Sequence, residues 1–140
     1  MLTTIIQASE NFCIHQIRES HTVSEGITKK RTLIAYIDIE EENSKKHRVY
    51  LASDINFMQR ISKVFLEEDD SDEETLIDMA LETANLIVGS AKVIAEEEQK
   101  NPYTIQTPHF LKIDSFDFTY DDSRVIKIEN DEMIIAIKEL

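Results

Sequence analysis

The sequence predicts an α+β fold in which two amphipathic helices pack on a mainly antiparallel sheet. Apolar residues recur at helical spacing after Asp54 and again in a long segment that ends near Glu98. Segments rich in β-branched and aromatic residues precede and follow these helical segments. The 140 residues are enough for one buried core, so residues 1–140 are predicted to form a single domain.

The predicted strands are the segments in which valine, isoleucine, tyrosine and phenylalanine concentrate. They cover residues 32–39, 48–52, 108–120, 125–128 and 133–137. The first two form a hairpin across a polar turn, and the last two form a second hairpin. Residues 1–30 are predicted as an N-terminal segment of strand and loop, because Ile5, Ile6 and Phe12 lie in short apolar runs with poor periodicity.

The first predicted helix covers residues 55–66 and begins after Asp54, whose carboxylate is suited to an N-cap. The next eight residues contain seven acids, which is typical of a solvated connector. Within them Ser71 and Glu74 have the spacing of a capping box, and acids suit the positive end of a helix dipole. A long helix is therefore predicted from about residue 72 to residue 98.

The long helix has one apolar and one polar face when its residues are placed at about 100° intervals. The predicted core face contains Leu76, Ile77, Ala80, Leu81, Ala84, Ile87, Val88, Ala91, Ile94 and Ala95. Asp78, Glu82, Asn85 and Gly89 line up on the opposite side. Glu82 and Asn85 are three residues apart, so their side chains are neighbours. An exposed acid and amide are most often only solvated.

Gly89 is unusual inside a helix, where it costs about 1 kcal/mol relative to alanine. It suggests that another group approaches the helix closely there. Met79, Leu86 and Val93 recur every seven residues beside the polar face. They form either an apolar row on which another protein docks or a set of contacts under the loops.

The formal net charge of −13 argues against nucleic acid and anionic membranes as partners, because both require clusters of lysine and arginine. No apolar run approaches the roughly 18 residues of a membrane span, and the N-terminus lacks the pattern of a secretory signal. A single cysteine, Cys13, cannot form an internal disulfide. We therefore expect a cytoplasmic protein.

Other candidate sites have weaker support. The four histidines, His15, His21, His47 and His109, show no pair at metal-ligand spacing, so no metal site is predicted. Cys13 lies among apolar residues and is expected to be an inert buried thiol. The chain has no glycine-rich phosphate loop and no nucleophile elbow.

The spacing of the polar face resembles the signature of the CheC/CheX/FliY family of chemotaxis phosphatases. In that signature an Asp or Ser is followed by Glu, Asn and a distant Pro. Here Asp78, Glu82, Asn85 and Pro108 are separated by three, two and twenty-two residues. Gly89 also stands where such proteins often have a glycine. With one motif in the chain, the likeness is greatest to CheX, since CheC-like proteins usually carry two.

This resemblance implies an enzyme that hydrolyses the phosphorylated aspartate of a CheY-type receiver. Asn85 would orient the attacking water, and Glu82 would pair with the receiver's lysine. Asp78 and Pro108 would support the local structure. The receiver would carry its own Mg²⁺, so no cofactor is expected on this chain. Phosphoryl transfer depends mainly on positioning and electrostatics, so two side chains on one helix are sufficient.

The resemblance also implies a homodimer, in which exposed hairpins would pair across a two-fold axis. Proteins of this family typically open with a helix, whereas the pattern of residues 1–30 here favours strand and loop. Two other functions remain open: a non-catalytic receiver-binding or flagellar-switch scaffold on the same fold, and an unrelated acidic α+β protein.

Overall fold

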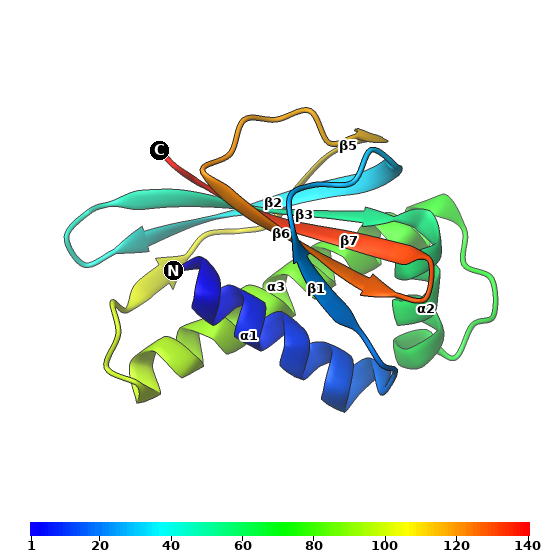
Figure 1. Cartoon of the computed structure of the whole chain (residues 1–140), viewed down its shortest axis with the longest axis horizontal. Coiled ribbons are helices and arrows are strands. Elements are labelled where there is room, and N and C mark those ends of the chain that lie inside the picture. Colours follow the sequence, from blue (N-terminus) through cyan, green and yellow to red (C-terminus); the bar gives the residue numbers. More distant parts are fainter.

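An antiparallel sheet of seven strands forms the centre of the computed structural model, which describes residues 1–140 (Figure 1). The strands are β1 (Thr22–Glu25), β2 (Arg31–Glu41), β3 (Lys46–Asp54), β4 (Tyr103–Ile105), β5 (His109–Ser115), β6 (Asp122–Ile128) and β7 (Asp131–Glu139). Their order is β1-β6-β7-β3-β2-β4, and β5 also pairs with β2. This confirms the predicted fold class and both predicted hairpins, β2–β3 and β6–β7.

Both faces of the sheet are covered. On β2, Leu33 and Ile37 belong to the main core between sheet and helices, whereas Ile34 faces a smaller cluster on the other side. Phe116 and Phe118, from the segment after β5, cover that second face. A strand buried on both sides needs apolar residues at nearly every position, which explains why β2 lacks a simple alternation.

The helices are α1 (Leu2–Phe12), continued by the π-helical turn η1 (Cys13–Ile17), α2 (Ile55–Leu66) and α3 (Glu73–Glu97). In Figure 1, α1 and α3 lie side by side on one face of the sheet, and α2 lies at one end. Helix α3 contacts α1, α2 and β2. The bounds of α2 match the prediction, and those of α3 differ from it by one residue at each end.

Residues 2–17 form α1 and η1, so the prediction of strands in this part of residues 1–30 is wrong. Leu2, Ile5, Ala8 and Phe12 are buried at intervals of three and four residues and form one face of α1. That face packs in the main core beside α3, and this packing overrides the strand preference of β-branched residues. The structure therefore has three helices, in agreement with the opening helix of the resembled family.

The start of α3 also differs from the expectation. The N-cap is Asp72, whose carboxylate accepts a hydrogen bond from the Thr75 backbone N–H at 2.9 Å, and this bond lowers the pKa of Asp72. Ser71 and Glu74 therefore do not form the predicted capping box. The hydroxyl of Ser71 is instead buried against Ser62, with 2.5 Å between the two oxygens.

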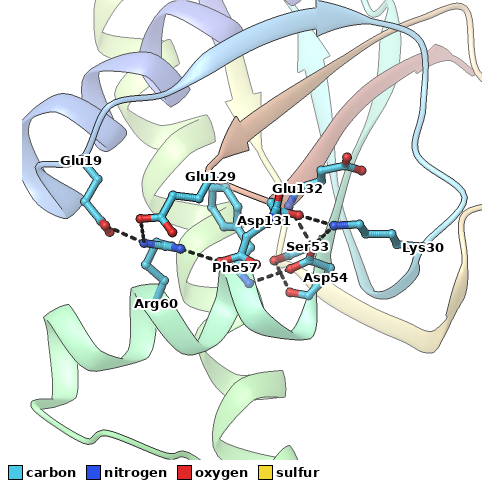
Figure 2. Close-up of polar contacts among 10 residues, drawn as sticks. Glu19, Lys30, Ser53, Asp54, Phe57, Arg60, Glu129, Asp131 and Glu132 are labelled. Carbon is cyan, nitrogen blue, oxygen red and sulfur yellow. Dashed lines mark hydrogen bonds and ion pairs between the residues drawn. The ribbon is translucent and has the colours of Figure 1, made fainter.

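The N-cap of α2 ties that helix to the β6–β7 hairpin (Figure 2). One carboxylate oxygen of Asp54 accepts a hydrogen bond from the Phe57 N–H at 2.6 Å, as predicted for a cap. The other accepts one from the Glu132 N–H at 2.8 Å and faces the Lys30 ammonium at 3.3 Å. A single buried carboxylate thus joins three segments that are distant in sequence.

Arg60 makes a second link between the same parts of the fold (Figure 2). Its guanidinium forms ion pairs with Glu19 at 2.5 Å and with Asp131 at 2.6 Å. Glu19 follows the N-terminal helix and Asp131 opens β7, so Arg60 fixes both against α2. Charge-assisted bonds of this kind are stronger than neutral ones, and here they hold the helical layer in place on the sheet.

We expect Asp54→Ala to lower the free energy of unfolding by about 2–3 kcal/mol, because it leaves the N–H groups of Phe57 and Glu132 without an acceptor. Asp72→Ala is the matched control, since it removes an N-cap that is exposed and accepts from Thr75 alone. Urea unfolding followed by circular dichroism measures both. Equal losses in the two variants would contradict the linking role of Asp54.

Candidate functional site

The polar face of α3 is exposed along its middle turns. Asp78, Glu82 and Asn85 are all solvent-exposed, as predicted. The opposite face is buried in the main core and consists of Leu76, Met79, Ala80, Thr83, Ala84, Ile87, Val88, Ala91 and Ala95. Because α3 continues without interruption from Glu73 to Glu97, this burial directs the acid and the amide outward.

Glu82 and Asn85 stand next to each other, since side chains three residues apart on an α-helix are neighbours. Thr83, which lies between them in the sequence, faces the core instead, where its hydroxyl donates a hydrogen bond to Met58 Sδ at 3.9 Å. No ion pair or side-chain hydrogen bond within the chain engages Glu82 or Asn85. Both groups are therefore free to bind a group on another molecule.

Gly89 leaves open space one helical turn after Asn85. A Cβ atom placed on Gly89 would meet nothing within 4 Å, so no part of the chain makes the close approach that its glycine suggested. Its backbone lies on the same side of α3 as Asn85. Because glycine has no side chain, nothing protrudes from the helix surface beside the amide at this position.

The predicted apolar row does not exist as such, because Met79 is buried in the main core with 6% of its surface exposed. Leu86 is half-buried, and Val93 is exposed to 51%. Helices α1 and α2 both pack against α3, so its apolar face is wider than contact with the sheet alone would require. Only Leu86 and Val93 remain as surface residues beside the polar face.

Asp78 and Pro108, the other two positions of the motif, lie on different elements of the fold. Asp78 is four residues before Glu82 and exposed, which places two carboxylates on one side of the helix. Pro108 precedes β5, whose pairing with β2 starts at His109, and β5 contacts α3. A proline fits the start of an edge strand because it has no N–H to donate to a ladder.

Tyr103, which no sequence motif predicted, holds α3 in place behind the site. It lies on β4 and donates a hydrogen bond from its hydroxyl to the Val88 carbonyl at 2.9 Å. Burial, together with the carboxylate of Glu96, raises the pKa of Tyr103, so the hydroxyl remains a donor at neutral pH. This bond fixes the turn of α3 that contains Gly89.

The remaining reactive side chains are engaged elsewhere. Cys13 is buried in η1, and its burial, with the nearby Glu10, raises the pKa of the thiol to about 12. A thiol with so high a pKa is a poor nucleophile, as expected. The His47 ring lies 3.0 Å from Glu41, and the structure brings no three His, Cys, Asp or Glu side chains together as a metal site. None of its helices is long and apolar enough to cross a membrane.

Comparison with known proteins relates the chain to one family. A family model described as "Chemotaxis phosphatase CheX" matches residues 34–129, which is more than half of the chain. This span includes Asp78, Glu82, Asn85, Gly89 and Pro108. No curated protein sequence matches the chain.

Solved structures share the fold at low sequence identity. CheX from Vibrio vulnificus has a TM-score of 0.80 at 15% identity, covering 99% of this chain and 98% of its own. CheX from Desulfovibrio desulfuricans has a TM-score of 0.75 at 16% identity, with coverages of 99% and 97%. A chain of the CheX–CheY–BeF₃–Mg²⁺ complex from Borrelia burgdorferi has a TM-score of 0.69 at 13% identity, with coverages of 99% and 97%.

Proposed function

The chain belongs to the CheX family of chemotaxis phosphatases, and from this premise we propose that it hydrolyses the aspartyl phosphate of a CheY-type response regulator in the cytoplasm. The observation that carries the proposal is the pair Glu82 and Asn85, which is exposed, adjacent and unpaired on an uninterrupted helix. The solved complex of a similar CheX with CheY, BeF₃ and Mg²⁺ supports a receiver of this type as the partner.

Asn85 is the proposed water-orienting residue. Its carboxamide both accepts and donates hydrogen bonds and does not titrate, so it can hold a water in one orientation over a wide pH range. The water oxygen forms a bond to phosphorus while the bond from phosphorus to the receiver aspartate breaks. The products are the free aspartate carboxylate and inorganic phosphate, which retains both protons of the water.

Glu82 is the proposed docking residue. Its carboxylate has no cation partner within the chain, so it is available for the lysine of the receiver. An ion pair formed one helical turn from Asn85 would fix the amide relative to the phosphoryl group. Asp78 adds negative charge on the same side, and Gly89 leaves room for the receiver surface.

The receiver's Mg²⁺ would supply the main electrostatic stabilisation of the phosphoryl oxygens, as the family resemblance implies. The chain itself then needs to contribute little further stabilisation to the transition state. A hundredfold acceleration corresponds to about 2.7 kcal/mol, which is comparable to the contribution of one preorganised hydrogen-bonding group. One amide held on a packed helix is therefore sufficient for this acceleration.

We expect Asn85→Ala to reduce the acceleration of receiver dephosphorylation about a hundredfold, because the oriented water is lost. The measurement is release of phosphate from phosphorylated receiver at saturating receiver concentration. Since Asn85 is exposed, the variant should unfold in urea like the wild type.

Two outcomes would contradict this prediction. Dephosphorylation by Asn85→Ala at the wild-type rate would remove the amide from the chemistry. Binding of the receiver by the wild type without any acceleration would favour the non-catalytic scaffold instead.

Reversal of charge at Glu82 tests the docking role. We expect Glu82→Lys to weaken binding of a BeF₃-loaded receiver at least tenfold at low salt, because the new ammonium repels the receiver lysine. Glu97→Lys is the matched control, since it makes the same change at an exposed position near the end of the same helix. Titration of each variant with the receiver at two salt concentrations separates the effect of the ion pair from that of the overall charge. Equal affinities of the two variants for the receiver would reject the ion pair.

We also propose that the protein is a homodimer. The β2–β3 hairpin extends past the helices at one end of the sheet, which leaves its outer end available to a second copy (Figure 1). Pairing of identical hairpins across a two-fold axis would bury their free backbone groups. Sedimentation equilibrium should give twice the chain mass at micromolar concentration, and a monomer there would reject the proposal.

A further inference from the structure

A pocket with a volume of about 330 Å³ lies where the start of α1, the β2–β3 hairpin and the end of α3 meet. Its lining includes Thr4 from α1, Lys45 and His47 from the hairpin, and Lys100 and Asn101 from the segment after α3. We call it the α1 N-terminal pocket. We propose that it binds the phosphate group of a small molecule, an inference that is independent of the function proposed above.

The hydroxyl of Thr4 is a buried donor without a partner. Thr4 is only 4% exposed, and its hydroxyl makes no hydrogen bond within the chain. The one side-chain polar atom that is both fully enclosed and unpaired is Nε of Arg60, so the Thr4 oxygen is open to the pocket that Thr4 lines. Buried polar groups normally have a partner, and here the pocket is the place from which one can come.

The first turn of α1 adds free backbone donors beside Thr4. The N-cap residue is Met1, whose side chain makes no capping hydrogen bond. The first backbone bond of the helix runs from the Ile5 N–H to the Met1 carbonyl. The N–H groups of Leu2, Thr3 and Thr4 therefore have no acceptor in the helix. Such N–H groups, together with the positive end of the helix dipole, favour a bound anion and are a common phosphate site.

Two lysines bring positive charge to the pocket in a chain whose net charge is −13. The ammonium of Lys45 lies 3.5 Å from Glu139, and that of Lys100 lies 2.7 Å from Glu98. All four side chains are at least 40% exposed. Exposed ion pairs contribute little to stability, so either lysine can turn to an anion in the pocket at small cost.

The acceptors at the pocket already have donors. The Glu41 carboxylate lines the pocket, but one of its oxygens lies 3.0 Å from Nε2 of the His47 ring. At the end of α3, the Ala95 carbonyl accepts a hydrogen bond from the Lys100 N–H at 2.8 Å. The groups left without a partner, the Thr4 hydroxyl and the first N–H groups of α1, are donors. The pocket therefore lacks an acceptor-rich ligand.

The size and charge of the pocket select a small phosphate compound. Ligand pockets have volumes of about 300–1,000 Å³, so this one is at the lower end of the range. A phosphate monoester has a charge of about −1.5 to −2 at pH 7 and three strong acceptor oxygens, which match several donors and a lysine. Nucleic acid and anionic membranes would need a larger basic surface than two lysines provide.

Titration of the isotope-labelled protein with glycerol phosphate, followed by NMR at constant ionic strength, tests the inference. We expect saturating shifts of the amide signals of Leu2, Thr3 and Thr4. Thr4→Val keeps the size of the side chain but removes the hydroxyl, and it should weaken binding at least tenfold. Thr3→Val is the matched control, because it makes the same change at the adjacent exposed residue, which does not line the pocket. It should bind like the wild type.

A second pair of variants keeps the test independent of the folding of Thr4→Val, which urea unfolding checks. Lys100→Gln should weaken binding at least threefold, because it removes one positive charge from the pocket. Lys127→Gln makes the same change in net charge at an exposed position of β6 and should leave the affinity unchanged.

Inorganic phosphate distinguishes the two sources of the phosphate group. Tighter binding of glycerol phosphate would support the inference and assign the site to a phosphate ester, whereas equal affinities would support it and assign the site to free phosphate. Shifts that do not saturate, that sodium chloride reproduces, or that persist unchanged in both Thr4→Val and Lys100→Gln would overturn it. Asn85→Ala should bind glycerol phosphate like the wild type, so loss of either proposal leaves the other standing.

Discussion

The burial of one face of α3 is the constraint on which the candidate site depends. Thr83 and Ile87 are almost completely buried, and the helical period then directs Glu82 and Asn85 to the opposite side. Contacts with α1, α2 and the sheet hold the helix from several directions. The hydroxyl of Tyr103 adds a fixed point at the Val88 carbonyl. The side chains of the pair are exposed, yet their backbone belongs to a helix that packs against α1, α2 and the sheet.

The sequence predicts well those features that depend on a single turn or a single helix or strand. Asp54 caps α2 as expected, and the bounds of that helix follow from one amphipathic run. The adjacency of Glu82 and Asn85 needs only the geometry of a regular helix. Their exposure follows as well, because the apolar residues of α3 define the buried side. Local patterns thus locate the candidate site before any tertiary contact is known.

What the sequence does not predict depends on contacts between distant segments. The α1 segment contains β-branched residues such as Ile5 and Ile6, and only its packing beside α3 selects the helix. The burial of Met79 has the same origin, since α1 and α2 widen the covered face of α3. A pocket between α1, α2 and α3 is lined by Phe12, Phe65 and Leu86, which no local spacing relates. When α1 is predicted as a strand, the surfaces to which α1 contributes cannot be predicted either.

If catalysis needs only an amide and a carboxylate, then specificity for the receiver must come from the surrounding surface. If the receiver brings the metal and the lysine, then an amide and a carboxylate on one helix would act on any receiver that can reach them. Discrimination between receivers must then come from contacts beyond this pair, since specificity is a difference of affinities.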